Sequence, residues 1–401
     1  MRRQVIALCA AAFVAAAVPG VAVAQAAPAG KPGFTRIFRL KPFSPPDILL
    51  ARELAPSMKE TTAFNTPTAL GAGYTFFGQF IDHDLTLDLT PLPSVKVDIS
   101  TLVNSRTPYF DLDSVYGGGP AKSPELYKGS RFRLSPDGRD VPRRPNGTAI
   151  IADPRNDENA IISQLHMVFL RLHNSFVDEG MSFAEAHRQV LVRYQKAVLT
   201  DFLPAMAGQT VTNQALIDRT PLYKPNENVD LPVEFTVAAY RFGHSMVRTA
   251  YRLAEEEEGL DVPFVQVFDG TPNDMTGGRP VPPDRVVYWP NFLQFPDEPA
   301  PVNVHRRIDP LLTDDLFELP FPSAITGGPS SLAERNLIRG KRYGLPTGQK
   351  VARRLGLRPL TNRQLGVSAM FGGGAPLWFY ILGEANSRTG GGSLGKVGGT
   401  I

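Results

Sequence analysis

A stripe of apolar side chains runs through residues 159–178. Its members fall at i, i+4, i+7, i+8, i+11 and i+15, which places them on one face of an α-helix; they are Ile161, Leu165, Val168, Phe169, Leu172 and Phe176. Downstream, Ser182 and Glu185 have the spacing of a capping box. A second helix is therefore predicted to begin there and to run to about Leu203, ahead of Pro204.

Shorter segments with helical periodicity alternate with irregular chain. We expect further helices within residues 68–88, where the helix would begin after Gly71 and Gly73, and at residues 233–253, 331–342, 348–355 and 362–371. Residues 89–150 contain many Pro, Gly and Arg and are predicted to be loop. Residues 254–330 are Pro-rich and are predicted to be irregular with a few short helices. Strand patterns are short and weak. The expected fold class is mainly α: a single large helical domain with long irregular loops and very little β.

The first 24 residues have the pattern of a secretory signal. Arg2 and Arg3 precede an apolar run, and the small residues that end at Ala24 offer a cleavage site. We therefore expect cleavage after Ala24 and a secreted or periplasmic protein. The apolar run is shorter than the ~20 residues that a membrane span needs, and no later stretch is long and apolar enough, so no stable membrane span is expected.

Three segments follow from this division of the chain. After the signal, the Pro-rich residues 25–60 are predicted to form an extended N-terminal arm, and residues 61–401 to form the domain. Residues 388–399 are rich in glycine and look unfinished as a domain end, which suggests a truncated C-terminus.

Charge and cysteine content narrow the class of protein. The 42 basic and 39 acidic residues leave a net charge of +3, which gives no case for nucleic-acid binding. The only cysteine, Cys9, lies in the predicted signal. The expected mature chain therefore has no disulfide, no thiol nucleophile and no cysteine-ligated metal. The oligomeric state is not readable from the sequence.

Asp82, His83 and Asp84 are consecutive in the first predicted helix. Neighbouring side chains on a helix point about 100° apart, so these three side chains would point in three different directions from one helix. A histidine between two carboxylates suits a reaction centre, with the histidine as a proton shuttle, one carboxylate for a cation and the other for a substrate or cofactor. Taken alone, the triplet is better explained as a polar helix end with capping aspartates.

His244 follows Gly243 in a predicted helix. The glycine removes a side chain next to the imidazole and permits close approach of a flat group. Taken alone, a kinked helix beside a buried, hydrogen-bonded histidine explains the pattern better than a metal ligand does. The remaining histidines, His166, His173 and His187, fall in ordinary amphipathic helices, and His305 receives no role.

Oxygen donors recur at every second residue of a loop. They are Thr107, the main-chain carbonyl of Tyr109, Asp111 and Asp113. Alternate residues of an extended segment point the same way, and a hard cation such as Ca²⁺ takes 6–8 oxygen ligands. Asp84 could complete the shell. A solvated Asp-rich turn explains the loop equally well.

Two further pairs of polar or charged residues lie just before or within predicted helices. Arg155 and Glu158 lie before the strongest helix, where acids suit the helix dipole and an arginine among acids usually forms a salt bridge; a functional arginine would face a developing negative charge. Asn336 and Arg339 lie in a basic run that would normally be a solvated face, although it also suits carboxylates such as porphyrin propionates.

The combination and order of these segments resemble the animal-type haem peroxidases, the peroxidase–cyclooxygenase superfamily, and the chain looks like a secreted bacterial member. The likeness runs from about residue 60 to 400. Its best segments are Gly78–Asp88, Thr107–Gly117, Ala152–Phe176, His187–Gly208, Tyr240–His244, Asn336–Pro346 and Pro376–Gly399. The resemblance implies that residues 61–401 form a haem peroxidase domain.

The resemblance implies roles on the two sides of a haem b group. His83 would be the distal acid–base histidine, Arg155 would stabilise negative charge as the O–O bond breaks, and Gln79 would order the distal water and any halide. His244 would be the proximal iron ligand, with Asn336 on its other ring nitrogen. Propionates would be held by Arg339, with Arg241 as a further candidate.

Carboxylates would have two more roles by the same resemblance. Asp82 and Glu158 match residues that form ester bonds to haem in vertebrate relatives. A Ca²⁺ site would comprise Asp84, Thr107, Tyr109, Asp111 and Asp113. The chain departs from the family pattern at Asp113, where serine is common, at Asn159, which excludes a methionine–haem bond, and at Tyr343, which replaces a frequent histidine.

The implied function is a peroxidase that uses H₂O₂ to oxidise a halide, a pseudohalide or a small phenolic donor. Two alternatives remain open. A fatty-acid oxygenase of the same superfamily would use a tyrosine three residues before the proximal histidine; that position is Arg241 here, and Tyr240 is four before. A non-catalytic adhesion or matrix protein could keep the same fold, and the short C-terminus would favour it.

Overall fold

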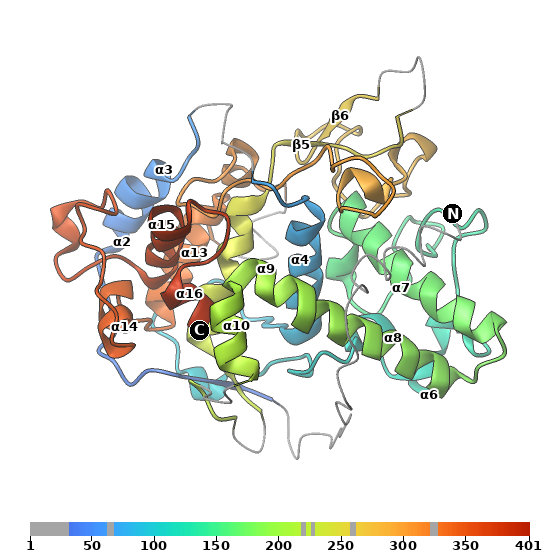
Figure 1. The fold of residues 1–401 in the computed structure, drawn as a ribbon, viewed down its shortest axis with the longest axis horizontal. Helices are drawn as coiled ribbons and strands as arrows, with labels where there is room; N and C mark the ends of the chain where they lie inside the picture. Colours follow the sequence, from blue (N-terminus) through green and yellow to red (C-terminus); the bar gives the residue numbers. More distant parts are fainter. Residues whose placement is uncertain (1–31, 62–67, 218–221, 226–228, 257–261, 321–327) are drawn as a thin grey trace.

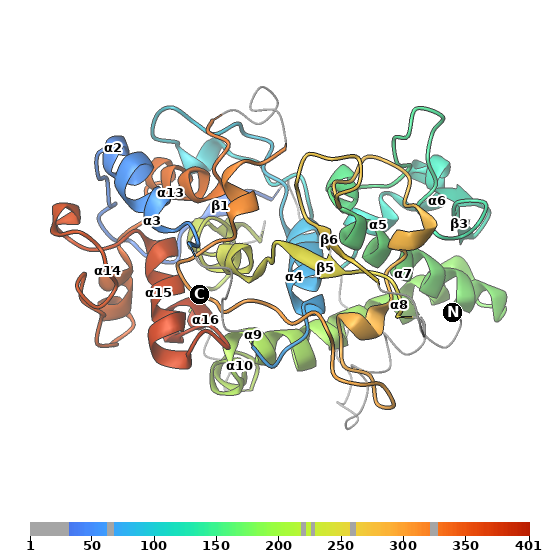
Figure 2. The same cartoon turned by 90° about the horizontal axis from the view of Figure 1, so that it is seen from above.

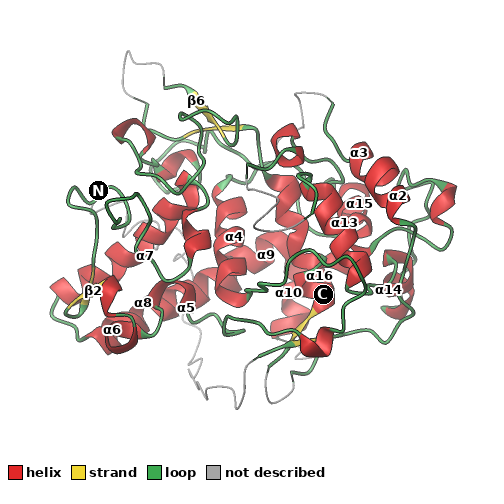
Figure 3. Cartoon of the chain, turned by 180° about the vertical axis from the view of Figure 1, so that it is seen from behind, coloured by secondary structure: helices red, strands yellow, loops and turns green. Residues whose placement is uncertain are grey.

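The computed structural model describes residues 32–61, 68–217, 222–225, 229–256, 262–320 and 328–401. The predicted signal and the first residues of the predicted arm lie outside this range. Helices joined by long irregular segments dominate the described chain, and the strands are short (Figure 3). The expected mainly α class is confirmed.

The α-helices include five that are longer than ten residues and build most of the frame. These are α4 Gly73–Leu85, α7 Ala160–Asp178, α8 Phe183–Ala197 and α15 Leu377–Thr389, together with α13 Leu332–Arg342. The shorter ones are α2 Asp47–Leu49, α3 Ala55–Ser57, α5 Asp113–Tyr116, α6 Gly119–Lys122, α9 Leu203–Ala207, α10 Gln209–Leu216, α11 Val233–Thr236, α14 Gly348–Arg354 and α16 Lys396–Thr400.

The other helical segments and the strands are short. The π-helical turns are η1 Leu50–Leu54 and η5 Val198–Phe202. The 3₁₀ segments are Ile99–Thr101, Pro124–Leu126, η4 Pro154–Asp157, η6 Ala239–Met246, Pro283–Arg285, Trp289–Asn291, Asp314–Phe317 and Ala369–Phe371. Three two-stranded sheets pair β1 Phe34–Thr35 with β4 Leu231–Pro232 in parallel, and β2 Tyr127–Lys128 with β3 Arg131–Phe132 and β5 Ala250–Arg252 with β6 Phe264–Gln266 antiparallel.

Helix α4 lies near the middle of the molecule (Figures 1 and 2). It packs against α7 and against η6, and α13 and α15 lie on the side opposite α7 and α8 in both views. Phe80 of α4 stacks on Phe169 of α7, with ring centroids 4.6 Å apart. The α4 residues that carry the candidate chemistry are therefore held between two halves of the helical frame.

The strongest helix predictions are confirmed. Asn159 caps α7, and its side chain accepts hydrogen bonds from the first turn. Ser182 and Glu185 form the predicted capping box of α8. The helix does not stop ahead of Pro204, however. The π turn η5 widens the helix there, so Pro204 lies in the first turn of α9, where its missing N–H costs no hydrogen bond.

Two predicted helices are wrong in part. The expected helix at 233–253 is interrupted: α11 and η6 are separate, and the chain becomes extended at Val247 before β5. Tyr251 is buried because it lies in this strand, not on a helix face. At 362–371 the chain forms hydrogen-bonded turns ended by Gly366 at a φ of +67°, and only the 3₁₀ segment at its end is helical.

The predicted extended arm is partly helical, since α2, η1 and α3 follow one another from Asp47 to Ser57. Pro56 is accommodated in the first turn of α3. The preceding residues are extended, and Glu234 accepts hydrogen bonds from the main-chain N–H groups of Ile37 and Phe38. This segment is thus bound into the helical frame.

Helix α15, which is buried from Leu377 to Ala385, was not predicted from the apolar pattern. A helix that is apolar all round lacks the polar–apolar period that reveals a surface helix. Glycines let α16 approach it closely, because a Cβ at Gly398 would lie 2.6 Å from Ile381. Among the described residues, no helix combines the length and the apolar character that crossing a membrane requires.

Candidate active site

Helix α4 places Gln79, Asp82, His83 and Asp84 on different faces, as the spacing predicts. Its N-terminal end is fixed by a close approach: the N–H of Gly73 donates to the carbonyl of Phe292 at 2.9 Å, and a Cβ at this glycine would lie 2.5 Å from a neighbouring leucine. His83 is only 4% exposed. The imidazole is therefore part of a rigid, buried setting.

Hydrogen bonds fix the tautomer of His83. Its Nδ1 lies 2.8 Å from Oδ1 of Asn156, and the amide nitrogen of Asn156 lies 3.0 Å from Nδ1 of His166. The amide oxygen therefore faces His83 and accepts its Nδ1 proton, which leaves a lone pair on Nε2. Burial, and after it the positive charge of Arg155, lowers the pKa of His83 to about 4. A neutral imidazole with a free Nε2 is a proton acceptor at neutral pH.

Arg155 lies beside this imidazole in the 3₁₀ segment η4. Its guanidinium donates to both oxygens of Asp153, at 3.1 and 2.8 Å, and to the carbonyl of His83 at 2.9 Å. Asp153 is fully buried and also accepts from Arg106. Although burial opposes ionisation, the Arg155 bonds hold the pKa of Asp153 below its usual range. The positive charge is thus positioned by a bidentate pair.

Glu158 and Gln79 lie on the other side of His83. Gln79 donates to Oε2 of Glu158 at 3.2 Å, and the same oxygen lies 4.0 Å from Nε2 of His83. Burial raises the pKa of Glu158 to about 7, against the opposing charge of Arg155. Asp82 accepts from Thr86 and faces the cavity described below. Of these groups, the Glu158 carboxylate lies nearest the free imidazole nitrogen, and Gln79 holds that carboxylate.

His244 lies in η6, and its Nδ1 is 2.8 Å from the amide nitrogen of Asn336 in α13. The amide oxygen accepts from Arg241 at 3.2 Å. Burial, and then the charge of Arg241, lowers the pKa of His244 to about 3. Trp378 lies edge-on to the ring, with centroids 6.4 Å apart, and donates to the carbonyl of Arg241. His244 is thus also a neutral imidazole, held at Nδ1.

A cavity of about 220 Å³ lies beside these groups; Asp82, Arg155 and Asn336 line it, whereas His83 and His244 do not. Its lining combines residues of α4, η4, η6 and α13 with residues of the N-terminal segment and its neighbours; they are Phe34, Asp82, Thr86, Leu87, Asp88, Arg155, Thr236, Val237, Arg241, Leu332, Arg335, Asn336, Arg339 and Tyr343. The four arginines outnumber the two carboxylates. A cavity lined mainly by polar side chains, with arginines in excess over carboxylates, suits an anionic ligand.

Arg339 is engaged at the edge of this cavity. It donates to Asp88 at 3.4 Å and to the hydroxyl of Tyr343 at 3.2 Å, and Tyr343 in turn donates to Asp88. Across the site, the hydroxyl of Tyr240 donates to the carbonyl of Gly78 at 3.3 Å. This bond ties the segment of His244 to the helix of His83.

The predicted Ca²⁺ ligands gather at the far end of α4. Oxygens of Asp84, Asp111 and Asp113 lie within 4.8 Å of one another. Within the described residues, Oδ2 of Asp84 and Oδ1 of Asp113 are buried without a hydrogen-bond partner. Burial, and then the two neighbouring carboxylates, raises the pKa of Asp84 well above its usual value.

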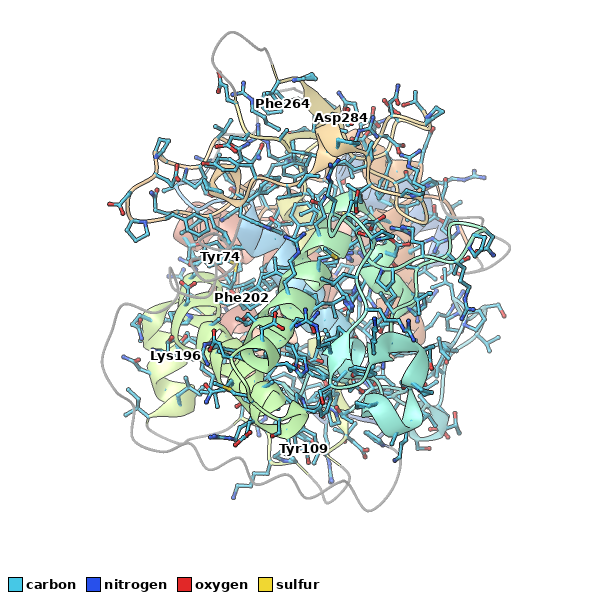
Figure 4. All side chains as sticks on the ribbon, turned by 90° about the vertical axis from the view of Figure 1, so that its right-hand side faces the viewer. Tyr74, Tyr109, Lys196, Phe202, Phe264 and Asp284 are labelled. Atoms are coloured by element: carbon cyan, nitrogen blue, oxygen red, sulfur yellow. The ribbon has the colours of Figure 1, made fainter. Side chains whose placement is uncertain are left out.

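The loop around these carboxylates is strained. Leu112 adopts a φ of +59°, which is unusual for a residue with a side chain. Thr107 donates from its hydroxyl to Asp111 at 2.7 Å and from its main chain to Asp113 at 3.1 Å. Tyr109 lies in the same loop (Figure 4). Buried carboxylate oxygens without hydrogen-bond partners, on Asp84 of α4 and at the start of α5 beside this loop, fit a cation of the Ca²⁺ type.

The other histidines have structural partners. His166 contacts Asn156, and His173 lies between the hydroxyl of Tyr116 and the carbonyl of Ser130. His187 packs on the ring of Tyr116. His305 is buried, with Nδ1 on a main-chain carbonyl.

Comparison with known sequences identifies the family. The sequence model of the animal haem peroxidases matches residues 92–365. The chain belongs to the animal haem peroxidase family. This match covers Arg155, His244 and Asn336, while the α4 residues precede it.

Individual relatives agree with this assignment. The chain is 26% identical to peroxinectin A of Dictyostelium discoideum over 52% of this chain and 38% of that protein, and 25% identical to chorion peroxidase of Aedes aegypti over 73% and 39%. The chain thus spans less than half the length of these curated relatives.

Solved structures share the fold. Peroxidase A from Dictyostelium discoideum superposes with a TM-score of 0.65 at 18% identity, covering 92% of this chain and 85% of that one. Oryza sativa fatty acid alpha-dioxygenase superposes with a TM-score of 0.61 at 15% identity, covering 92% and 74%.

Sequence reasoning missed three polar residues of the site. Asn156 holds His83, Asp153 holds Arg155, and Asp88 holds Arg339. The first two neighbour Arg155 in the chain, so their position beside a candidate residue was the only available signal.

Proposed function

We propose that this protein is a haem-dependent peroxidase. The observation that carries the proposal is a pair of neutral imidazoles on adjoining elements, each held at Nδ1 by an asparagine. Within the described residues, the Nε2 atoms of His83 and His244 have no hydrogen-bond partner. Two imidazoles with free Nε2 atoms beside an arginine-lined cavity fit an iron porphyrin better than a hydrolytic metal site, which needs three clustered ligands.

His244 would bind the iron of haem b, and Arg241 and Arg339 would hold its propionates. A histidine that binds iron through Nε2 carries its proton on Nδ1 and needs an acceptor there. The amide of Asn336 presents its nitrogen, so haem binding would require this amide to turn and offer its oxygen. Its bond with Arg241 would then break, which would release that guanidinium for a propionate.

When bound, haem would supply the redox chemistry, since it can give two electrons to H₂O₂. Nε2 of His83 would take a proton from one oxygen of H₂O₂ and return it to the other oxygen, which leaves as water. Asn156 keeps Nε2 free for this transfer. Arg155 would stabilise the negative charge that develops as the O–O bond breaks, and Gln79 would order the water beside His83.

The reducing substrate would be a halide, a pseudohalide or a small phenol. The positive charge at the cavity favours an anion such as a halide. The fatty-acid oxygenase alternative has less support, because Arg241 occupies the position three before His244 and the hydroxyl of Tyr240 donates to Gly78 in the helix of His83. A non-catalytic role would not require a free Nε2 on both histidines.

The chain reconstituted with haem tests this proposal. It should show a ferric Soret band and oxidise guaiacol or bromide when H₂O₂ is added. A panel of halides and phenols would then rank the donors. Protein that stays colourless with added haem would reject the proposal. The proposed export can be checked by sequencing the N-terminus of the protein secreted by its host, which should begin after Ala24.

We further propose ester bonds from Asp82 and Glu158 to haem. After turnover with H₂O₂, haem in the wild type should resist extraction by acidified acetone, because an ester bond survives unfolding. The Asp82→Asn, Glu158→Gln double variant should release all of its haem. Asp88→Asn is the matched control, since Asp88 lines the same cavity, and it should retain haem as the wild type does. Free extraction from the wild type would refute the esters.

We also propose that Asp84, Thr107, Tyr109, Asp111 and Asp113 bind Ca²⁺. Chelation with EGTA should lower the melting temperature by about 3–5 °C, because the buried carboxylates then repel one another without a cation. Calorimetry with and without added Ca²⁺ measures this shift.

Two variants calibrate the Ca²⁺ experiment. Asp111→Asn should reduce the response of the melting temperature to Ca²⁺. Asp137→Asn alters an exposed turn carboxylate and should leave the response unchanged. If EGTA lowers the melting temperature of Asp111→Asn as much as that of the wild type, the site is wrongly placed.

A further inference from the structure

A second cavity lies between α4, α7 and α8 and shares no lining residue with the one described above. Its volume is about 80 Å³. Tyr74 and Phe202 mark its flank of the molecule, above Lys196 in Figure 4. The lining includes Tyr74, Phe77, Phe169, Arg193, Ala197 and Asp201.

The walls of this cavity are well packed. Phe77 lies edge-on to Tyr194 and to Phe202, with centroids 6.1 and 5.7 Å away. Phe169 lies edge-on to Tyr194 at 5.8 Å and stacks on Phe80. Ring contacts of this kind hold the walls in place. The cavity is thus a preformed space, and the short side chain of Ala197 leaves part of it open.

A polar pair lies at the edge of these apolar walls. The hydroxyl of Tyr74 donates to Asp201 at 2.7 Å, and burial raises the pKa of Asp201. Arg193 lies over the ring of Phe176 and donates to Gln189. No ion pair joins Arg193 to an acid within the described residues. The cavity therefore presents a carboxylate acceptor and a guanidinium donor beside an apolar interior.

The backbone is distorted to produce this edge. Asp201 lies in the π turn η5, which interrupts the helical run between α8 and α9. Single π turns in helices occur frequently at functional sites. Even half-buried, a carboxylate–hydroxyl pair costs desolvation, and apolar residues of similar size would fill the space at lower cost. Two independent features, the distortion and the polar pair, thus point to a ligand.

We propose that this cavity binds a small uncharged alcohol, with its apolar part among the α7 side chains and its hydroxyl at Asp201 and Arg193. A hydroxyl donates one hydrogen bond and accepts others, which matches an acceptor and a donor together. An engineered 150 Å³ apolar cavity binds benzene, so about half that volume suits a branched alcohol of four or five heavy atoms. A carboxylate or an ammonium group would be attracted by one of these side chains and repelled by the other, and it would lose its hydration on entry, so each would bind more weakly than the alcohol.

Ligand-observed NMR with 2-methylpropan-1-ol tests the proposal on the full chain without peroxide. Saturation transfer to the methyl groups should saturate at millimolar alcohol. Ala197→Leu, which fills the cavity, should weaken binding at least tenfold. Ala184→Leu makes the same change at an exposed position of the same helix and should bind as the wild type does. Circular dichroism checks that both variants are folded.

Head-group selectivity gives a second test that does not depend on Ala197→Leu folding. 2-Methylpropanoate and 2-methylpropylamine have the same branched body, and each should bind at least tenfold more weakly than the alcohol. Asp201→Asn and Tyr74→Phe should each weaken alcohol binding several-fold. Equal binding of the three head groups, unchanged binding to a folded Ala197→Leu variant, or no binding to the wild type would overturn the proposal.

Discussion

Replacing His83 with alanine should leave the Soret band of the haem-loaded protein in place and lower the rate of its reaction with H₂O₂ by roughly 10²–10⁴-fold, the range expected for loss of a general acid–base group. The iron ligand would be unaffected, since His83 and His244 lie on different elements, α4 and η6. Stopped-flow absorbance after mixing with H₂O₂ measures the rate directly.

His83→Gln separates proton transfer from packing. Glutamine fills much of the same volume and can still donate to Asn156, yet it does not titrate. It should therefore lose rate as His83→Ala does. A glutamine variant with the wild-type rate would show that His83 fills space and transfers no proton.

The pH profile gives an independent check on the same residue. Burial and the charge of Arg155 lower the pKa of His83 to about 4. The neutral form accepts the proton, so the wild-type rate should persist down to about pH 5 and fall as pH drops through 4. His83→Gln should lack this acidic limb. A wild-type limb near the ordinary histidine value would contradict the buried setting.

The reactive residues of the site could be predicted from the sequence, but partners such as Asn156 could not. His83, Arg155 and His244 were identified by residue type and order along the chain, and the structure places each beside the cavity or its lining. What makes them useful is the network around them. Asn156 reaches His83 across 73 positions of sequence, and no local pattern encodes such a contact.

The fold shows the same division. Helix α7 was predictable because one face meets the core and its cap is local. Helix α15 was not predictable, because its residues Leu377–Ala385 are all buried and show no alternation of polar and apolar faces. The interruption of the 233–253 segment, which contains His244, was also missed: its apolar spacing suits a helix, and the pairing of β5 with the distant β6 determines its end.

Replacing His244 with alanine should abolish the normal Soret band or shift it strongly, because iron loses its proximal ligand. Bound haem stabilises the folded state by mass action, so the melting temperature with added haem should fall toward the haem-free value. Titration of the purified protein with haem, followed by absorbance and by thermal unfolding, measures both effects.

The dependence of His244 on Asn336 makes this prediction specific. Asn336→Ala keeps the imidazole and removes its Nδ1 partner, so haem affinity should fall by roughly 10–100-fold while a histidine-type spectrum remains. Added imidazole should restore the band in His244→Ala by entering the space of the lost ring, and it should do little for Asn336→Ala. If His244→Ala binds haem with an unchanged spectrum, iron is held elsewhere, and the assignment of both histidines fails together, since His83 acts on peroxide only when iron lies within its reach.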